Sequence, residues 1–151
     1  MADYFTKLSF ELDCTELEAD RLVAAFGLTG DEAALPAALA PSFPATDRGD
    51  LLSGVAALYD GADAFDVGAR IDRRPGGVWI HGDGDPQVLA IAEFIRRLAP
   101  SALPTGFTWA NDCSRSRPGG FGGGYVLITR DAYDVFDVAA LLEDALEAAR
   151  G

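Results

Sequence analysis

The sequence has little of several residue types on which common functional sites depend. Its 151 residues include two cysteines, one histidine and one lysine, Lys7. Two cysteines exclude a disulfide-rich scaffold and a four-thiolate zinc site. No apolar run approaches the roughly 20 residues of a membrane span, and no basic segment followed by an apolar core marks a signal peptide. We therefore expect a cytoplasmic protein that binds no cofactor and does not associate with a membrane.

Length and composition predict one folded domain, residues 1–151. Hydrophobic residues make up 49% of the chain and charged residues 24%. This balance is typical of a globular protein and not of a disordered one. A chain of this length buries roughly two thirds of the surface that its unfolded form exposes, which is enough for a sizeable core.

Acidic residues dominate the two ends of the chain. The net charge is −12. Residues 1–66 contain 3 basic and 13 acidic side chains, residues 67–130 contain 8 and 5, and residues 131–151 contain 1 and 6. Such a charge keeps a protein soluble, and it repels nucleic-acid phosphates, so general nucleic-acid binding is not expected. A basic protein partner, or a small anion at the central segment, is compatible with this layout.

The first part of the chain predicts a strand followed by helices. Residues 4–13 alternate between apolar and mostly polar side chains, which is typical of a half-buried strand. Thr15 and Glu18 match a capping box, and apolar residues at helical spacing follow them. Proline-interrupted residues 31–40 and an apolar stripe at 51–59 indicate shorter helices in an elaboration of this connection.

The middle of the chain predicts a hairpin, a helix and two more strands. The hairpin covers residues 64–81, with a turn rich in proline and glycine. Asp85 is the expected N-cap of a helix over 86–98, because Pro86 suits the first helical position. Residues 107–111 and 125–129 alternate in the manner of strands.

These elements predict an α+β fold. Apolar residues at helical spacing from Val135 to Ala149 indicate a C-terminal helix with an acidic outer face. The order of elements predicts a mixed, mainly antiparallel sheet of about five strands with helices packed on one face. This order includes the ferredoxin-like one, with an inserted helix and an additional C-terminal strand and helix.

One edge of the predicted sheet brings together chemically versatile residues. A single helix joins strand 78–81 to strand 107–111, so we expect the two strands to run parallel and to end at the same edge. The loops after them contain the only histidine, a cysteine and two arginines. The candidate functional edge comprises His81, Asp83, Trp109, Cys113, Arg115 and Arg117.

Nucleophilic and metal-binding interpretations each explain part of this edge. Cys113 with His81 as base and Asp83 as orienting group would form a nucleophilic site if the base lies within about 3 Å of the thiol. His81, Asp83 and Asp85 offer nitrogen and oxygen ligands for a metal, but Asp85 is also the expected helix cap. Neither set is complete, so we assign no catalytic and no metal-binding residue.

Arginines and tryptophans support two further interpretations. Arg115 and Arg117 precede five glycines in residues 119–124, and guanidinium groups with open backbone amides suit an anion. These glycines join two strands instead of preceding a helix, so the segment is not a P-loop. If helices cover only one face of the sheet, Trp79 and Trp109 are expected to form an exposed aromatic patch. Otherwise the C-terminal helix or the elaboration covers them.

A motif in the second half of the chain comprises Trp109, Cys113, Ser114, Arg117, Pro118, Phe121 and the glycines 122–124, after Val78–His81 and an Asp-Pro helix start. Through this motif about a third of the chain, residues 76–130, resembles a family of small uncharacterised bacterial proteins that also occur in phages and other mobile elements. The resemblance implies a shared feature formed by the motif residues and supplies no activity. Gly119 and Gly120 stand where acidic residues would be expected, which weakens any charge-dependent role of this loop.

These observations predict a non-enzymatic interaction protein that neutralises a basic protein partner. It would act as an immunity-type antitoxin of a nuclease, or as a mobile-element protein that blocks a nucleic-acid-handling defence complex. One alternative is a ligand-binding or enzymatic domain that uses the His81, Cys113 and Arg115 edge. Another is a housekeeping domain whose acidity serves only solubility. Cys14 and Cys113 would pair only if their Cα atoms lie within about 7 Å.

Overall fold

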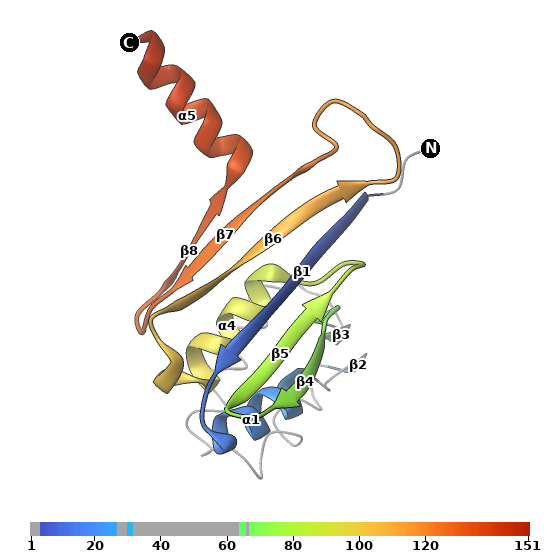
Figure 1. The fold of residues 1–151 in the computed structure, drawn as a ribbon, viewed down its shortest axis with the longest axis vertical. Helices are drawn as coiled ribbons and strands as arrows, with labels where there is room; N and C mark the ends of the chain where they lie inside the picture. The colour runs from blue at the N-terminus through green and yellow to red at the C-terminus, as the bar shows by residue number, and fades with distance from the viewer. Residues whose placement is uncertain (1–3, 27–29, 32–63, 66) are drawn as a thin grey trace.

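The computed structural model describes residues 4–26, 30–31, 64–65 and 67–151 (Figure 1). The strands are β1 (Tyr4–Asp13), β2 (Gly30–Asp31), β3 (Ala64–Phe65), β4 (Arg70–Arg74), β5 (Gly77–Gly82), β6 (Thr105–Cys113), β7 (Gly122–Ile128) and β8 (Tyr133–Asp137). The helices are α1 (Glu16–Phe26), α4 (Val88–Leu98), the 3-10 helix η2 (Pro100–Ala102) and α5 (Val138–Arg150). Apart from Asp31, which belongs to β2, the helices expected at 31–40 and 51–59 lie outside the described residues.

Six strands form one antiparallel sheet in the order β4-β5-β1-β6-β7-β8, and β2 pairs separately with β3. The α+β class is confirmed, but the main sheet has six strands instead of about five, and no two of its neighbouring strands are parallel. Strands β5 and β6 do run in the same direction, because both pair with β1 between them. The order β4-β5-β1-β6, with α1 and α4 as crossovers, is the ferredoxin-like one.

Local sequence signals account for β1 and α1. Leu8 and Leu12 of β1 are buried, whereas the residues between them are at least partly exposed. The amide of Thr15 donates to the Glu18 carboxylate at 3.0 Å, and the amide of Glu18 donates to the Thr15 hydroxyl at 3.1 Å. This pair is the predicted capping box, and it satisfies two amides that the first helical turn leaves without partners.

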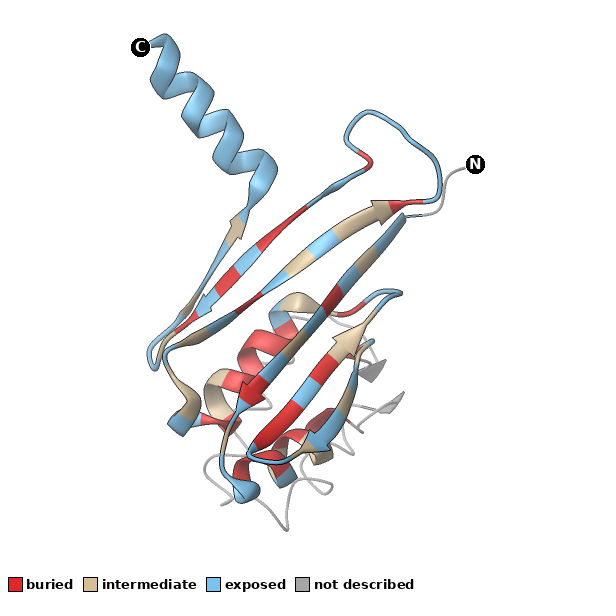
Figure 2. Cartoon of the chain, in the orientation of Figure 1, coloured by how far each residue is buried: buried red, intermediate tan, exposed pale blue. Residues whose placement is uncertain are grey.

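Helices α1 and α4 pack against the same face of the sheet, which we call the helix-side face (Figure 2). The apolar core between them and the strands includes Leu22, Val78, Ile80, Ile91, Phe94, Ile95, Leu98, Val126 and Ile128, all 0–1% exposed. Each such side chain contributes about 1.5–3 kcal/mol when it is fully buried. On the opposite face, which we call the open face, no described helix covers the strands.

The prediction that Asp85 caps the helix after β5 is wrong. Helix α4 begins at Val88, and Gln87 occupies the N-cap position without a side-chain capping bond. The backbone amide of Gln87 donates to the carbonyl of Val67 at 2.8 Å, and its side chain donates to the carbonyl of Asp85 at 3.1 Å. These bonds tie the connection to the segment before β4, so the first helical turn starts beyond it.

Strand β1 joins two halves of the sheet that are staggered along its length. Its residues 8–13 pair with β5, and its residues 4–7 pair with β6. Beyond Lys7 the strands β1 and β6 separate (Figure 1). Phe10 of β1 stacks on Phe107 of β6 with ring centroids 4.5 Å apart. This stagger decides which of the candidate residues meet.

The C-terminal region departs most from the prediction. Val135 lies in β8 and not in a helix, because the Thr129 amide bonds the Ala132 carbonyl at 2.8 Å and returns the chain along β7. Helix α5 starts only at Val138, and all of its residues are exposed (Figure 2). It therefore does not pack on the sheet with α1 and α4. In the described part of the chain, no helix is long and apolar enough to cross a membrane.

Candidate functional site on the open face

The structure does not bring His81 and Cys113 together. Strands β5 and β6 end in the same direction, as predicted, but β1 lies between them. His81 is opposite Ser9 of β1, and Cys113 is opposite Tyr4. Five residues of an extended strand separate these positions by about 17 Å. The prediction that His81 and Cys113 are neighbours is therefore wrong, and the stagger of β6 along β1 is the reason.

Cys113 is buried on the helix-side face beside the loop 114–121. A Cβ on Gly120 would lie 3.4 Å from the Cys113 Sγ, so the loop packs closely over the thiol. Arg115 and Arg117 are exposed on this loop. Without His81 nearby, the proposed Cys113, His81 and Asp83 nucleophilic set does not assemble.

Two other sequence-based interpretations also fail on geometry. Cys14 and Cys113 are both free and lie at opposite ends of β1, so they do not pair. Within the described residues, no cluster of three or more histidine, cysteine or carboxylate side chains is arranged to hold a metal. His81, Asp83 and Asp85 are thus not arranged as the metal-binding site that their spacing in the sequence suggested.

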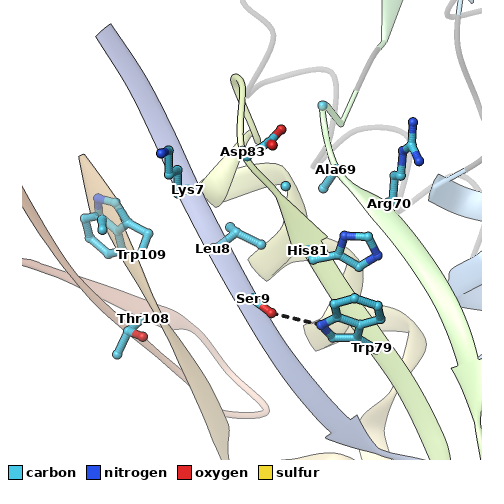
Figure 3. A pocket seen from close by; sticks show the side chains of 13 residues that line it. Lys7, Leu8, Ser9, Ala69, Arg70, Trp79, His81, Asp83, Thr108 and Trp109 are labelled. Atoms are coloured by element: carbon cyan, nitrogen blue, oxygen red, sulfur yellow. Dashed lines mark hydrogen bonds between the residues drawn. The ribbon is translucent and has the colours of Figure 1, made fainter. Parts of the chain in front are cut away.

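Three of the predicted residues, His81, Asp83 and Trp109, do line a common depression. It has a volume of about 900 Å³ and lies where β1 and β6 separate (Figure 3). Its other polar side chains come from neighbouring strands and include Lys7, Ser9 and Arg70. Trp79, which was not among the predicted edge residues, also lines it. The depression is therefore the place where side chains from the two halves of the sheet converge.

Trp79 is held in place by its neighbours on three strands. Its ring stacks on His81 with centroids 3.8 Å apart, and its Nε1 donates to the Ser9 hydroxyl at 2.9 Å. The His81 Nε2 lies 2.7 Å from the carboxylate of Asp72 on β4. Trp79 is nevertheless 41% exposed. The result is an indole ring that is fixed in orientation and available for contact.

A second aromatic group occupies the other end of the open face. Tyr125 of β7 stacks on Phe136 of β8 with ring centroids 4.6 Å apart. Both side chains, together with exposed Leu127, point away from the face on which Val126 and Ile128 are buried. The open face thus carries an aromatic group at each side.

Trp79 and Trp109 do not form one aromatic patch. The register pairs Trp109 with Gly124, on the same side of the sheet as buried Phe107 and Val126, whereas Trp79 alternates with buried Val78 and Ile80. The two tryptophans therefore lie on opposite faces, although both line the depression.

Carboxylates outnumber basic groups on the open face. Alternation along the strands places there the acids Glu11, Asp13, Asp72, Asp112 and Asp134 and the bases Lys7, Arg70 and Arg74. Arg74 pairs with Glu11 and Asp13, each at 2.9 Å. Lys7 pairs with Asp112 at 2.9 Å, and this hydrogen bond raises the pKa of Lys7 and lowers that of Asp112. Two of the three bases are thus already neutralised by carboxylates.

Sequence reasoning missed Ser9, Asp72 and the Tyr125–Phe136 pair. Alternation within each strand does place Trp79 and His81 on one face. The partners across strands depend on register, which a single strand does not specify. Comparisons with protein-family models, with curated proteins and with solved structures find no match to this chain.

Proposed function

We propose that this chain is a non-enzymatic, acidic interaction protein that binds and neutralises a basic protein partner. The observation that carries the proposal is the open face itself. It is six strands wide, no described helix covers it, and it presents fixed aromatic groups at Trp79 and at Tyr125 and Phe136. Aromatic side chains dominate the energetics of protein interfaces, and fixed ones lose little entropy on binding.

The charge of this face favours a basic partner. Its surplus carboxylates and the net charge of −12 attract a basic surface and speed association, and salt screens that attraction. The same charge repels phosphates. These properties fit an immunity-type or anti-defence protein of a mobile element, whose carboxylates occupy positions where a nuclease or a defence complex would hold nucleic-acid phosphates.

The Trp79→Ala variant should bind this partner about tenfold more weakly than the wild type. Tryptophan is enriched among the few interface residues whose truncation costs more than about 1 kcal/mol of binding free energy, and a tenfold change in Kd corresponds to about 1.4 kcal/mol. The partner is first captured from a host lysate at low and at high salt, then identified and purified. Titration calorimetry with the purified partner gives Kd for both chains. We expect one basic protein that is bound at low salt and released at high salt.

Leu17→Ala is the matched control for this measurement. Leu17 is 54% exposed on α1, which packs on the helix-side face, so its truncation should leave Kd unchanged. A partner that binds Trp79→Ala as tightly as the wild type would show that the open face is not the contact. Failure to find any salt-sensitive basic partner would refute the proposed function.

A further inference from the structure

Helix α5 presents an apolar stripe that packs on none of the core residues that the structure describes. Val138, Leu141, Leu142 and Leu146 share one side of the helix, and each is at least 40% exposed. None of the thirteen residues of α5 is buried. An isolated helix of this length is only marginally stable in water, and most helices are stabilised by packing an apolar face. We therefore expect these apolar side chains to pack on a surface that stabilises the helix.

The chain cannot supply that surface from its own sheet. Strand β8 ends at Asp137 and α5 begins at the next residue, Val138. Asp137 is also the helix cap, since its carboxylate accepts a hydrogen bond from the Ala140 amide at 3.1 Å. With no connecting residues, the helix leaves the sheet outward (Figure 1) and cannot turn back over it.

A surface that matches the stripe is nevertheless present on the same chain. Helices α1 and α4 bury one part of the helix-side face and leave its outer part, toward β8, exposed. Val135 of β8 and Trp109 of β6 lie on this outer part, because both share a side with buried Phe107 and Val126, yet Val135 is exposed and Trp109 is half-buried. One chain thus holds two apolar surfaces that cannot meet each other.

Local charges also complement each other, although the whole chain is acidic. On the two flanks of its stripe α5 carries Glu143 and Asp144. The loop 114–121 carries Arg115 and Arg117 and no acid. Strands β6 and β8 run in the same direction because both pair with β7, so this loop and the start of α5 lie beyond the same edge of the sheet. The acidic helix of one chain suits the basic loop of another.

We propose that the partner on which α5 packs its apolar stripe is a second copy of this chain. Two chains exchange their C-terminal helices across a two-fold axis, and each α5 packs its apolar stripe on the outer helix-side face of the other chain. Such exchange of an identical element is a common route to a dimer, and a short connection at the hinge favours it. The open face with Trp79 stays free for another partner.

Sedimentation equilibrium over a range of protein concentrations tests this dimer. The wild type should be a dimer, and Leu142→Asp should be a monomer, because a carboxylate would be buried in the apolar contact. The control is Leu17→Asp, the same substitution at a comparably exposed leucine of α1, which should remain dimeric. Trp79→Ala should also remain dimeric, which separates this contact from the one proposed for the basic partner.

A second variant separates helix exchange from simple loss of the helix. Inserting about four glycine and serine residues between Asp137 and Val138 provides a connection of ordinary length, so α5 can fold onto its own sheet. This variant should be monomeric and keep the helix content of the wild type by circular dichroism. The inference is overturned by a wild type that is monomeric throughout, or by a dimer that survives Leu142→Asp. A monomeric wild type whose Leu142→Asp variant loses the basic partner would assign α5 to that partner instead.

Discussion

Replacing Gly124 with alanine is expected to lower the free energy of unfolding by about 3 kcal/mol or more. Gly124 lies opposite Trp109 in the β6–β7 register. A Cβ at this position would lie 2.7 Å from Cη2 of the Trp109 ring and would overlap the backbone carbonyl of Phe136. Backbone and ring are both held by the sheet, so the strands must separate to admit one methyl group.

Thermal unfolding followed by circular dichroism measures this loss. For a domain of about 150 residues, 3 kcal/mol corresponds to a fall of about 6–12 °C in Tm. Gly122→Ala is the matched control in the same strand, because the nearest atom to its added Cβ would be the Asn111 Nδ2 at 3.7 Å. We expect Gly122→Ala to change the free energy by less than about 1 kcal/mol. Equal losses in both variants would contradict the close contact at Gly124.

The contact between Trp109 and Gly124 gives a structural reason for part of the sequence motif that runs from Trp109 to Gly124. Trp109 lies directly against Gly124, and Gly123 has a φ of 141° and leaves no room for a Cβ beside the Trp109 carbonyl. Both glycines therefore permit close pairing of β6 and β7. At these three positions the motif reflects packing, and a functional role is not needed to explain them.

Elements with complete local signals could be predicted from the sequence. Strand β1 is marked by ten alternating residues, and α1 is marked by the Thr15 and Glu18 capping box. Both start and end close to the predicted positions, since neighbouring residues alone determine alternation and capping.

Elements whose form depends on pairing with another segment could not be predicted. Val135 fits the helical spacing of the residues after it, but pairing with Val126 draws it into β8. Asp85 has the sequence context of an N-cap, but the bond from Gln87 to Val67 moves the start of α4. In both cases, backbone hydrogen bonding to residues outside the expected helix overrides a sound local signal.

Predicting the candidate site requires the stagger of β6 along β1, which the sequence alone does not show. Strand direction was predicted correctly and places the ends of β5 and β6 at the same edge. The stagger then separates His81 from Cys113 and brings His81 to Ser9 instead. Because side chains alternate between faces, register decides which residues share a surface. The aromatic groups of the open face emerge only when this register is known.

Replacing Glu18 with glutamine is expected to lower the free energy of unfolding by about 3 kcal/mol at neutral pH. Glu18 is a buried residue, only 5% exposed. It accepts a hydrogen bond from the Thr15 amide at 3.0 Å, a second from the Ser101 amide at 2.9 Å and a third from the Ser101 hydroxyl. It thereby links the start of α1 to η2. A glutamine amide would turn a donor toward groups that are themselves donors.

The same substitution should change how stability depends on pH. Burial raises the pKa of Glu18, but the hydrogen bonds from Ser101 and Thr15 outweigh burial and leave this pKa below its usual value. The unfolded chain has a glutamate pKa of about 4.3. The charged carboxylate therefore stabilises the fold above about pH 4.3, and this contribution is lost as the pH falls through the lower pKa of the folded state. Glutamine does not titrate and shows no such loss.

Urea unfolding of the wild type and of Glu18→Gln, at about pH 7 and at about pH 3, measures this dependence. We expect the difference in free energy between the two chains to be largest at neutral pH and to shrink at acidic pH. Glu16→Gln is the control, because Glu16 is an exposed carboxylate two residues away on the same helix. A difference that stays constant between the two pH values would show that side-chain shape, and not the charge of Glu18, stabilises this junction.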